Sequence, residues 1–229
     1  MKKFLACPEY WANVDGTRIR IVPPPRQLNP QMYYCRKGFP SINAQIICDA
    51  TLTIRNVCAA FPGSSNDFFV WSGTVAKDVM VQAYFEDGCW LLGDSGYFLA
   101  PWLHVPIPHA APGTPEFDYT QIHCSARNCV ERCIGVLKAR WRCLCSDRAL
   151  TYRPTFSGQI INACCALHNY CLFRGLLNPR PYIQRVPVVL PDYNDLPRGL
   201  LARAAAEQRH LIYYAHARKQ RLRQQQLLE

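Results

Sequence analysis

Short apolar and alternating segments in the first half of the chain predict four β-strands. Residues 11–22 are expected to form a strand pair or one long strand, broken at an internal Asp-Gly pair, because Asp-Gly is a turn or bulge signal. Residues 41–49 and 56–61 follow, and these strands together predict an antiparallel meander. The fourth strand, residues 89–93, is short and fully apolar.

A helix is predicted to begin after the turn at residues 62–65 and to run to about Tyr84. Ser64 or Ser65 can cap this helix, because a serine hydroxyl accepts a hydrogen bond from an unpaired backbone N–H of the first turn. Asp67 suits that first turn, where negative charge is favourable.

The proline-rich segment 101–115 is expected to be a loop. It precedes the longest helical pattern, residues 118–144, which has an apolar stripe at helical spacing. A nearly all-apolar helix, residues 157–175, is expected to be buried against the sheet. Strands followed by a helix, a strand and further helices predict a mixed α/β fold.

We expect three parts along the chain: a core over 1–178, a proline-rich linker over 179–197 and a basic helix over 198–229. One face of the last helix is apolar, which suits a helix lying on a membrane surface. The same apolar face also suits a helix that packs on the core while its basic side chains contact DNA. This second interpretation is favoured. The basic cluster 218–223 resembles a nuclear import signal or a solvated helix end.

Charge and cysteine content narrow the class of partner. The formal net charge is +10, which favours a polyanion such as nucleic acid or an anionic membrane surface. Hydrophobic residues make up 49% of the chain, so it is expected to fold around a core. The 13 cysteines lack the Cys-x-x-Cys spacing of zinc sites, and no segment has the ~20 apolar residues of a membrane span.

Three acidic residues stand out by position: Asp15 in the first strand region, Asp94 directly after an apolar strand, and Glu131 in the long helix. Carboxylates from separate elements can share two Mg²⁺ or Mn²⁺ ions, which then act on a phosphodiester. Spacing alone leaves the ordinary alternatives open. A strand-terminal Asp is more often a turn residue, and a helical Glu is more often solvated or paired with a residue one turn away.

Basic residues surround Glu131 on nearly one face of the predicted helix: Arg127, Lys138 and Arg142. A carboxylate flanked by cations suits a site that holds a metal and a phosphate backbone together. These three residues are therefore candidate contacts to DNA phosphates. The alternative is a salt-bridged exposed face, in which three cations share one anion.

Five ordered sequence blocks between Asn13 and Gly175 closely resemble those of the PIF/Harbinger transposases and the Harbinger transposase-derived nucleases. They are residues 14–19 (VDGTRI), 62–67 (PGSSND), 91–97 (LLGDSGY), 123–142 (HCSARNCVERCIGVLKARWR) and 163–169 (ACCALHN). The resemblance implies a ribonuclease-H-like mixed sheet flanked by helices and a DDE catalytic triad of Asp15, Asp94 and Glu131. It further implies a divalent metal, with two ions, and cleavage of DNA phosphodiesters.

The resemblance also assigns secondary residues and partners. Asp67 matches a further family acid, so it is either a helix-start residue or an accessory site residue. His123 either contacts phosphate or caps its helix, and His168 is expected to be a hydrogen-bonded core histidine. Only 14 residues precede Asp15, so the helical DNA-binding segment of the family is expected to be absent.

The expected function is a metal-dependent DNA endonuclease with no small-molecule cofactor and no membrane partner. The alternative is a non-catalytic relative of a transposase that binds DNA or protein. A Myb-like partner protein is implied by the family alone. The expected compartment is the nucleus, with the cytoplasm as a second location.

Overall fold

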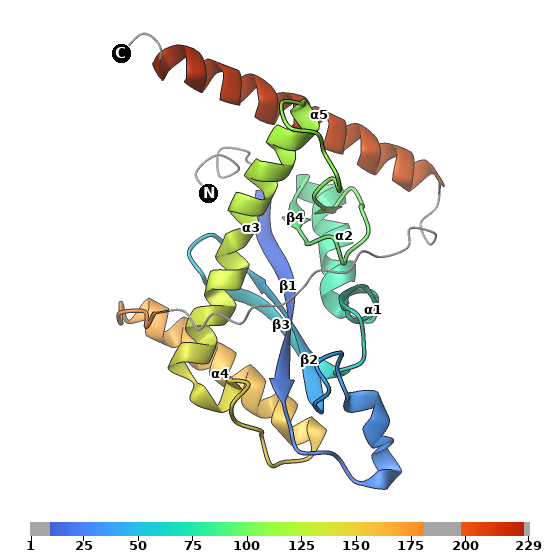
Figure 1. The fold of residues 1–229 in the computed structure, drawn as a ribbon, viewed down its shortest axis with the longest axis vertical. Helices are drawn as coiled ribbons and strands as arrows, with labels where there is room; N and C mark the ends of the chain where they lie inside the picture. The colour runs from blue at the N-terminus through green and yellow to red at the C-terminus, as the bar shows by residue number, and fades with distance from the viewer. Residues whose placement is uncertain (1–9, 181–197, 227–229) are drawn as a thin grey trace. The chain divides into compact units, whose positions relative to one another are not determined.

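The computed structural model describes residues 10–180 and 198–226, which form parts of two compact units. Of the described residues, the first unit contains 10–11, 80–128 and 198–226, and the second contains 12–79 and 129–180. The long helix α3 (Pro115–Arg140) contributes its first half to the first unit and its second half to the second. Figure 1 shows the elements in chain order.

The second unit is built on three antiparallel strands in the order β3-β2-β1. They are β1 (Tyr10–Arg20), β2 (Ser41–Cys48) and β3 (Ile54–Pro62). The predicted meander is confirmed. All eight residues of β2 are buried, as expected for the central strand of a sheet covered on both faces.

β1 continues through its Asp-Gly pair, so the predicted break in this strand is wrong. Gly16 keeps its place in the ladder opposite Gln45. A Cβ atom at Gly16 would come within 2.2 Å of Asp67 Oδ1. This glycine is therefore explained by the close approach of another side chain and not by a turn.

The helix α4 (Pro154–Phe173) lies against β3 and β2 in the second unit (Figure 1). A Cβ atom at Gly158 would come within 2.6 Å of the Ala59 carbonyl oxygen, so a glycine permits this close contact. Apolar residues from α4, the strands and the second half of α3 form one core, which includes Ile46, Cys133 and Ile161. The predicted long helix ends at Arg140, and a separate 3-10 turn, η3 (Arg142–Leu144), follows it.

Two helices replace the single helix predicted up to Tyr84. They are α1 (Asp67–Ser72) and α2 (Val75–Asp87). Asn66, and not a serine, caps α1, because its side chain accepts a hydrogen bond from Phe69 N at 2.6 Å. The chain breaks at Gly73 and Thr74, and the hydroxyl of Thr74 donates to the Trp71 carbonyl at 2.9 Å. The segment between β1 and β2 also forms two short 3-10 turns, η1 (Arg26–Leu28) and η2 (Pro30–Tyr33).

The first unit holds a parallel strand pair, β4 (Trp90–Leu92) and β5 (Leu103–His104). β4 confirms the predicted fourth strand, whereas β5 lies in a segment expected to be a loop. A two-residue strand carries too little periodicity to be recognised in sequence. Antiparallel and parallel strand pairs with flanking helices give the predicted mixed, ribonuclease-H-like α/β fold.

The C-terminal helix α5 (Arg198–Gln226) belongs to the first unit. Leu211 and Ile212 are buried in a core with Trp90, Leu92 and Tyr119. The apolar face of α5 therefore packs on protein, which is the interpretation the sequence favoured. In the described part of the chain, no helix has the length and apolar character needed to cross a membrane. Most of the predicted linker, residues 181–197, lies outside the described residues.

Candidate active site

Asp15 lies on the face of the sheet that α3 covers. Side chains alternate along a strand, so Asp15 shares a face with Ile19, and Ile19 packs in the core with Cys133 and Val136 of α3. The carboxylate is half-buried, and its Oδ1 accepts a hydrogen bond from Gly16 N at 2.8 Å. The strand and this N–H together fix the direction of the carboxylate.

Lys138 lies in the interior of the second unit, with 2% of its surface exposed. Its Nζ donates to the Arg18 carbonyl at 3.4 Å. Burial lowers the pKa of this amine to about 8, and the Asp15 carboxylate acts in the opposite direction, raising it. The predicted role of Lys138 as a phosphate contact does not fit, because a buried amine cannot reach a DNA backbone outside the fold.

Glu131 and Arg142 are both exposed in the second unit. Arg142 lies 3.7 Å from Asp147, and both side chains are more than half exposed, so this ion pair adds little stability. Arg142 is therefore accessible to an anionic ligand. The assignment of Glu131 as a metal ligand stays a prediction, and so does that of Arg127, a half-buried residue of the first unit, as a phosphate contact.

Asp94 lies in the first unit, two residues after β4 ends. Its Oδ1 accepts a hydrogen bond from Gly96 N at 2.8 Å, the geometry of an Asx-turn. A Cβ atom at Gly96 would be 2.9 Å from the same oxygen, so a glycine favours this turn. The half-buried carboxylate is thereby held at the carboxyl end of a buried strand.

Asp67 is the centre of a polar network that fastens the 62–67 loop to the sheet. Its Oδ1 accepts from Arg18 Nη1 at 3.2 Å and from Asn43 Nδ2 at 2.9 Å. Arg18 also donates to the carbonyls of Gly63 and Ser65, at 3.0 and 2.9 Å. These contacts, and its position as the first residue of α1, favour a structural role for Asp67 over an accessory one.

His123 is fully buried within α3, in the first unit. Its Nε2 contacts the His104 carbonyl oxygen at 3.1 Å, so this nitrogen carries the proton. Burial lowers the pKa of His123 to about 4 and that of His104 to about 3. Neither role expected for His123, phosphate contact or helix capping, fits a buried histidine in the middle of a helix.

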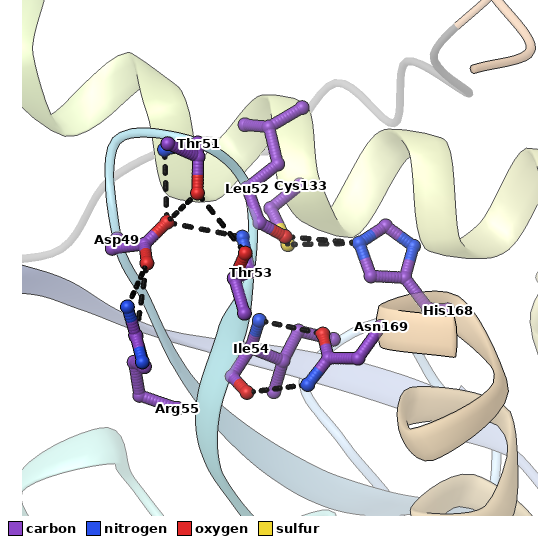
Figure 2. Close-up of polar contacts among 9 residues, drawn as sticks. All are labelled: Asp49, Thr51, Leu52, Thr53, Ile54, Arg55, Cys133, His168 and Asn169. Atoms are coloured by element: carbon purple, nitrogen blue, oxygen red, sulfur yellow. Dashed lines mark hydrogen bonds and ion pairs between the residues drawn. The ribbon is translucent and has the colours of Figure 1, made fainter. Parts of the chain in front are cut away.

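His168 and its neighbour Asn169 anchor α4 to the turn between β2 and β3 (Figure 2). His168 is fully buried, and its Nε2 lies 3.0 Å from the Leu52 carbonyl oxygen, which also accepts from Cys133 Sγ at 3.4 Å. The expected hydrogen-bonded core histidine is therefore confirmed. This one carbonyl connects α3, α4 and the turn.

Asn169 was not singled out in the sequence, although it belongs to one of the five blocks. Its Oδ1 accepts from Ile54 N at 2.9 Å and its Nδ2 donates to Ile54 O at 2.8 Å (Figure 2). The side-chain amide therefore pairs with a strand backbone as a neighbouring strand would. On the far side of the turn, Asp49 accepts from Thr51, Thr53 and Arg55.

We expect Asn169→Ala to lower the free energy of unfolding by about 2 kcal/mol, because both backbone groups of Ile54 lose their partner in a half-buried site. Denaturant unfolding followed by circular dichroism measures this difference. Asn162→Ala is the matched control, since Asn162 is exposed on the same helix. Equal stability of the two variants would show that the Asn169 contacts add nothing.

The three predicted ligands are chemically suited to a hard divalent cation, because carboxylate oxygens are the donors that Mg²⁺ and Mn²⁺ prefer. Within residues 10–180 and 198–226, no group of three or more His, Cys, Asp or Glu side chains is arranged to hold a metal ion. Within the described residues, the support for metal binding is therefore the chemistry of the three carboxylates.

Comparison with known proteins supports the resemblance. The family model for the DDE superfamily endonuclease matches residues 14–169. The rat and human proteins HARBI1, which are named as nucleases, are each 37% identical over 150 residues, covering 63% of this chain and 41% of the relative. An Arabidopsis thaliana protein named ALP1-like is 24% identical over 180 residues, 73% of this chain and 44% of the relative.

The chain thus spans less than half the length of these curated relatives. No solved structure matches it significantly. The matched segment covers well over half of the chain and includes all five blocks that first suggested the resemblance. The chain therefore belongs to the DDE superfamily endonuclease family.

Proposed function

We propose that this protein is a divalent-metal-dependent DNA endonuclease that uses Asp15, Asp94 and Glu131 as its acidic triad. The observation that carries the proposal is the family match over residues 14–169, within which all three carboxylates are present in the family's motifs. Two of them have defined orientations, because Gly16 N and Gly96 N each hold one carboxylate oxygen.

In this proposal the three carboxylates hold the cations, with two ions as the expected number. Bound divalent ions would stabilise the negative charge that builds up when a phosphodiester is attacked. Arg142, which is exposed, and Arg127 are the candidate contacts to the DNA backbone. Lys138 is left out of this set because of its burial.

The test is cleavage of end-labelled duplex and single-stranded DNA by the purified chain with Mg²⁺ or Mn²⁺. The expected result is cleavage that requires the metal, stops with a chelator and is weaker at high salt, because phosphate contacts release counterions. Absence of cleavage with either metal, from a chain shown to be folded, contradicts the proposal.

A non-catalytic DNA-binding or protein-interaction module is the second candidate, and Lys138 favours it. The Lys138 amine is buried in the same unit, and the Asp15 carboxylate raises the pKa of that amine, so Asp15 interacts with a basic group of the chain itself. Calorimetry with Mn²⁺ separates the candidates. Binding that is lost in Asp15→Asn and Asp94→Asn supports the nuclease, whereas salt-dependent DNA binding without Mn²⁺ binding supports the module.

The same proposal includes a nuclear location and a Myb-like partner protein that brings the complex to DNA. Both rest on family membership and on the net charge of +10. Co-purification with a tagged Myb-like protein and imaging of the tagged chain test these two points separately from cleavage.

A further inference from the structure

The outer face of α4 carries several exposed aromatic side chains. The opposite face of this helix is buried against the strands through Ser157, Gly158, Ile161 and Cys165. On the outer face Phe156, Tyr170 and Phe173 have 49%, 56% and 85% of their surfaces exposed. Exposed aromatic side chains along one face of a helix are candidates for an interaction surface, because they bury a large apolar area when covered.

The exposed positions follow the spacing of a helix that pairs with another helix. Steps of three and four residues alternate along the face, which is the a/d spacing of a coiled-coil seam. Every residue at these positions is exposed. The six residues, called here the α4 seam, are Phe156, Gln159, Ala163, Ala166, Tyr170 and Phe173.

The α4 seam lies on a helix of 20 residues that contains no Asp, Glu, Lys or Arg. The chain as a whole carries a formal net charge of +10. Two copies of such a chain repel each other wherever basic surfaces meet. The six positions of the α4 seam therefore bring no charge into the contact, and the basic caps Arg153 and Arg174 lie at its two ends.

The α4 seam is also symmetric in residue size about its centre. The first and last positions are both phenylalanine, and the two central positions are both alanine. The two positions in between hold the larger residues glutamine and tyrosine. In an antiparallel pair related by a two-fold axis, Phe156 faces Phe173, Gln159 faces Tyr170 and Ala163 faces Ala166 of the other copy. Small residues then lie at the centre, where the backbones approach closely, and aromatic pairs lie at both ends.

We propose that this protein forms a homodimer through antiparallel pairing of the α4 seam of one copy with that of a second. A two-fold contact requires one surface to be complementary to itself, and the size symmetry of the α4 seam meets that requirement. At the polar step, the Gln159 amide can hydrogen-bond the Tyr170 hydroxyl of the second copy.

The experiment measures the molar mass of the full chain by light scattering and analytical ultracentrifugation. The wild-type chain is expected to have the mass of a dimer. Ala163→Glu and Ala166→Arg are each expected to be monomeric, because each places two unpaired charges in the contact. Both alanines are exposed and both replacements are compatible with a helix, so the variants are expected to fold.

Mixing the two monomeric variants in equal amounts is expected to restore a dimer. In the proposed register, Glu at position 163 of one variant faces Arg at position 166 of the other, and the second central contact keeps two alanines. Gln31→Glu, at an exposed position of η2 and outside α4, is the control and is expected to stay dimeric.

A monomeric wild-type chain overturns the proposal, and so does a dimer that persists in either single variant. Failure of the mixture to form a heterodimer overturns the antiparallel register. If residues 181–197 or another protein's helix cover the α4 seam, the wild-type chain is expected to be monomeric, and that result overturns the proposal.

Discussion

Replacing Asp94 with asparagine is expected to reduce metal-dependent DNA cleavage by more than about 100-fold. Loss of a residue that only supports a metal ligand already reduces metal affinity or activity about 10–100-fold, so loss of a ligand itself has the larger effect. Asparagine keeps the size of the side chain and can still accept the Gly96 N–H, so the turn after β4 is expected to remain. The change removes the negative charge that a cation requires.

Cleavage rates of Asp94→Asn and Asp15→Asn are compared with that of Asp87→Asn, an exposed acid at the end of α2 and outside the triad. Circular dichroism and thermal unfolding establish that the three variants fold alike. Activity that survives Asp94→Asn removes this residue from the site, while an equal loss in Asp87→Asn indicates a nonspecific effect of charge on DNA binding.

Acidification from pH 7 to pH 5 is expected to lower the free energy of unfolding by about 4 kcal/mol through His104 and His123 alone. Both are fully buried, and burial holds their pKa values near 3 and 4, below the ordinary value of 6.5. The unfolded chain therefore binds protons first as the pH falls. The stability is fully present above pH 6.5 and is lost progressively as the pH falls through these folded-state values.

The environment of the two rings explains why the neutral forms are favoured. Neither Nδ1 atom has a hydrogen-bond partner in the described part of the chain, and the ring of His104 lies against Trp90. A second proton, on the Nδ1 atom of either ring, would place an unpaired charge in an apolar interior. His123→Gln keeps an amide that can donate to the His104 carbonyl but does not titrate.

Denaturant unfolding at pH 7 and pH 5 tests this expectation. The stability difference between the two pH values is expected to be about 2 kcal/mol smaller in His123→Gln than in the wild-type chain, because one of two titrating groups is gone. An equal pH dependence in both proteins would mean that His123 is protonated in the folded state at pH 5.

The sequence predicted only part of the candidate site. Asp15 and Asp94 could be selected because each lies in a specific block at a strand, and the structure adds the N–H groups that orient them. Lys138 could not be interpreted correctly. Helical spacing groups Lys138 with Glu131. The carbonyl that accepts the hydrogen bond of its amine belongs to Arg18 in β1, which is 120 residues away in the chain.

The sequence by itself determined the family, the three-stranded meander, β4, the long helix and the core position of His168, because motifs and periodicity are local properties. Tertiary structure alone decided which side of each helix is covered. It buried Lys138 and His123, engaged Asp67 with Arg18, paired Asn169 with Ile54, and left the α4 seam exposed. The physical reason is that burial depends on contacts between residues far apart in the chain, which the order of neighbouring residues does not specify.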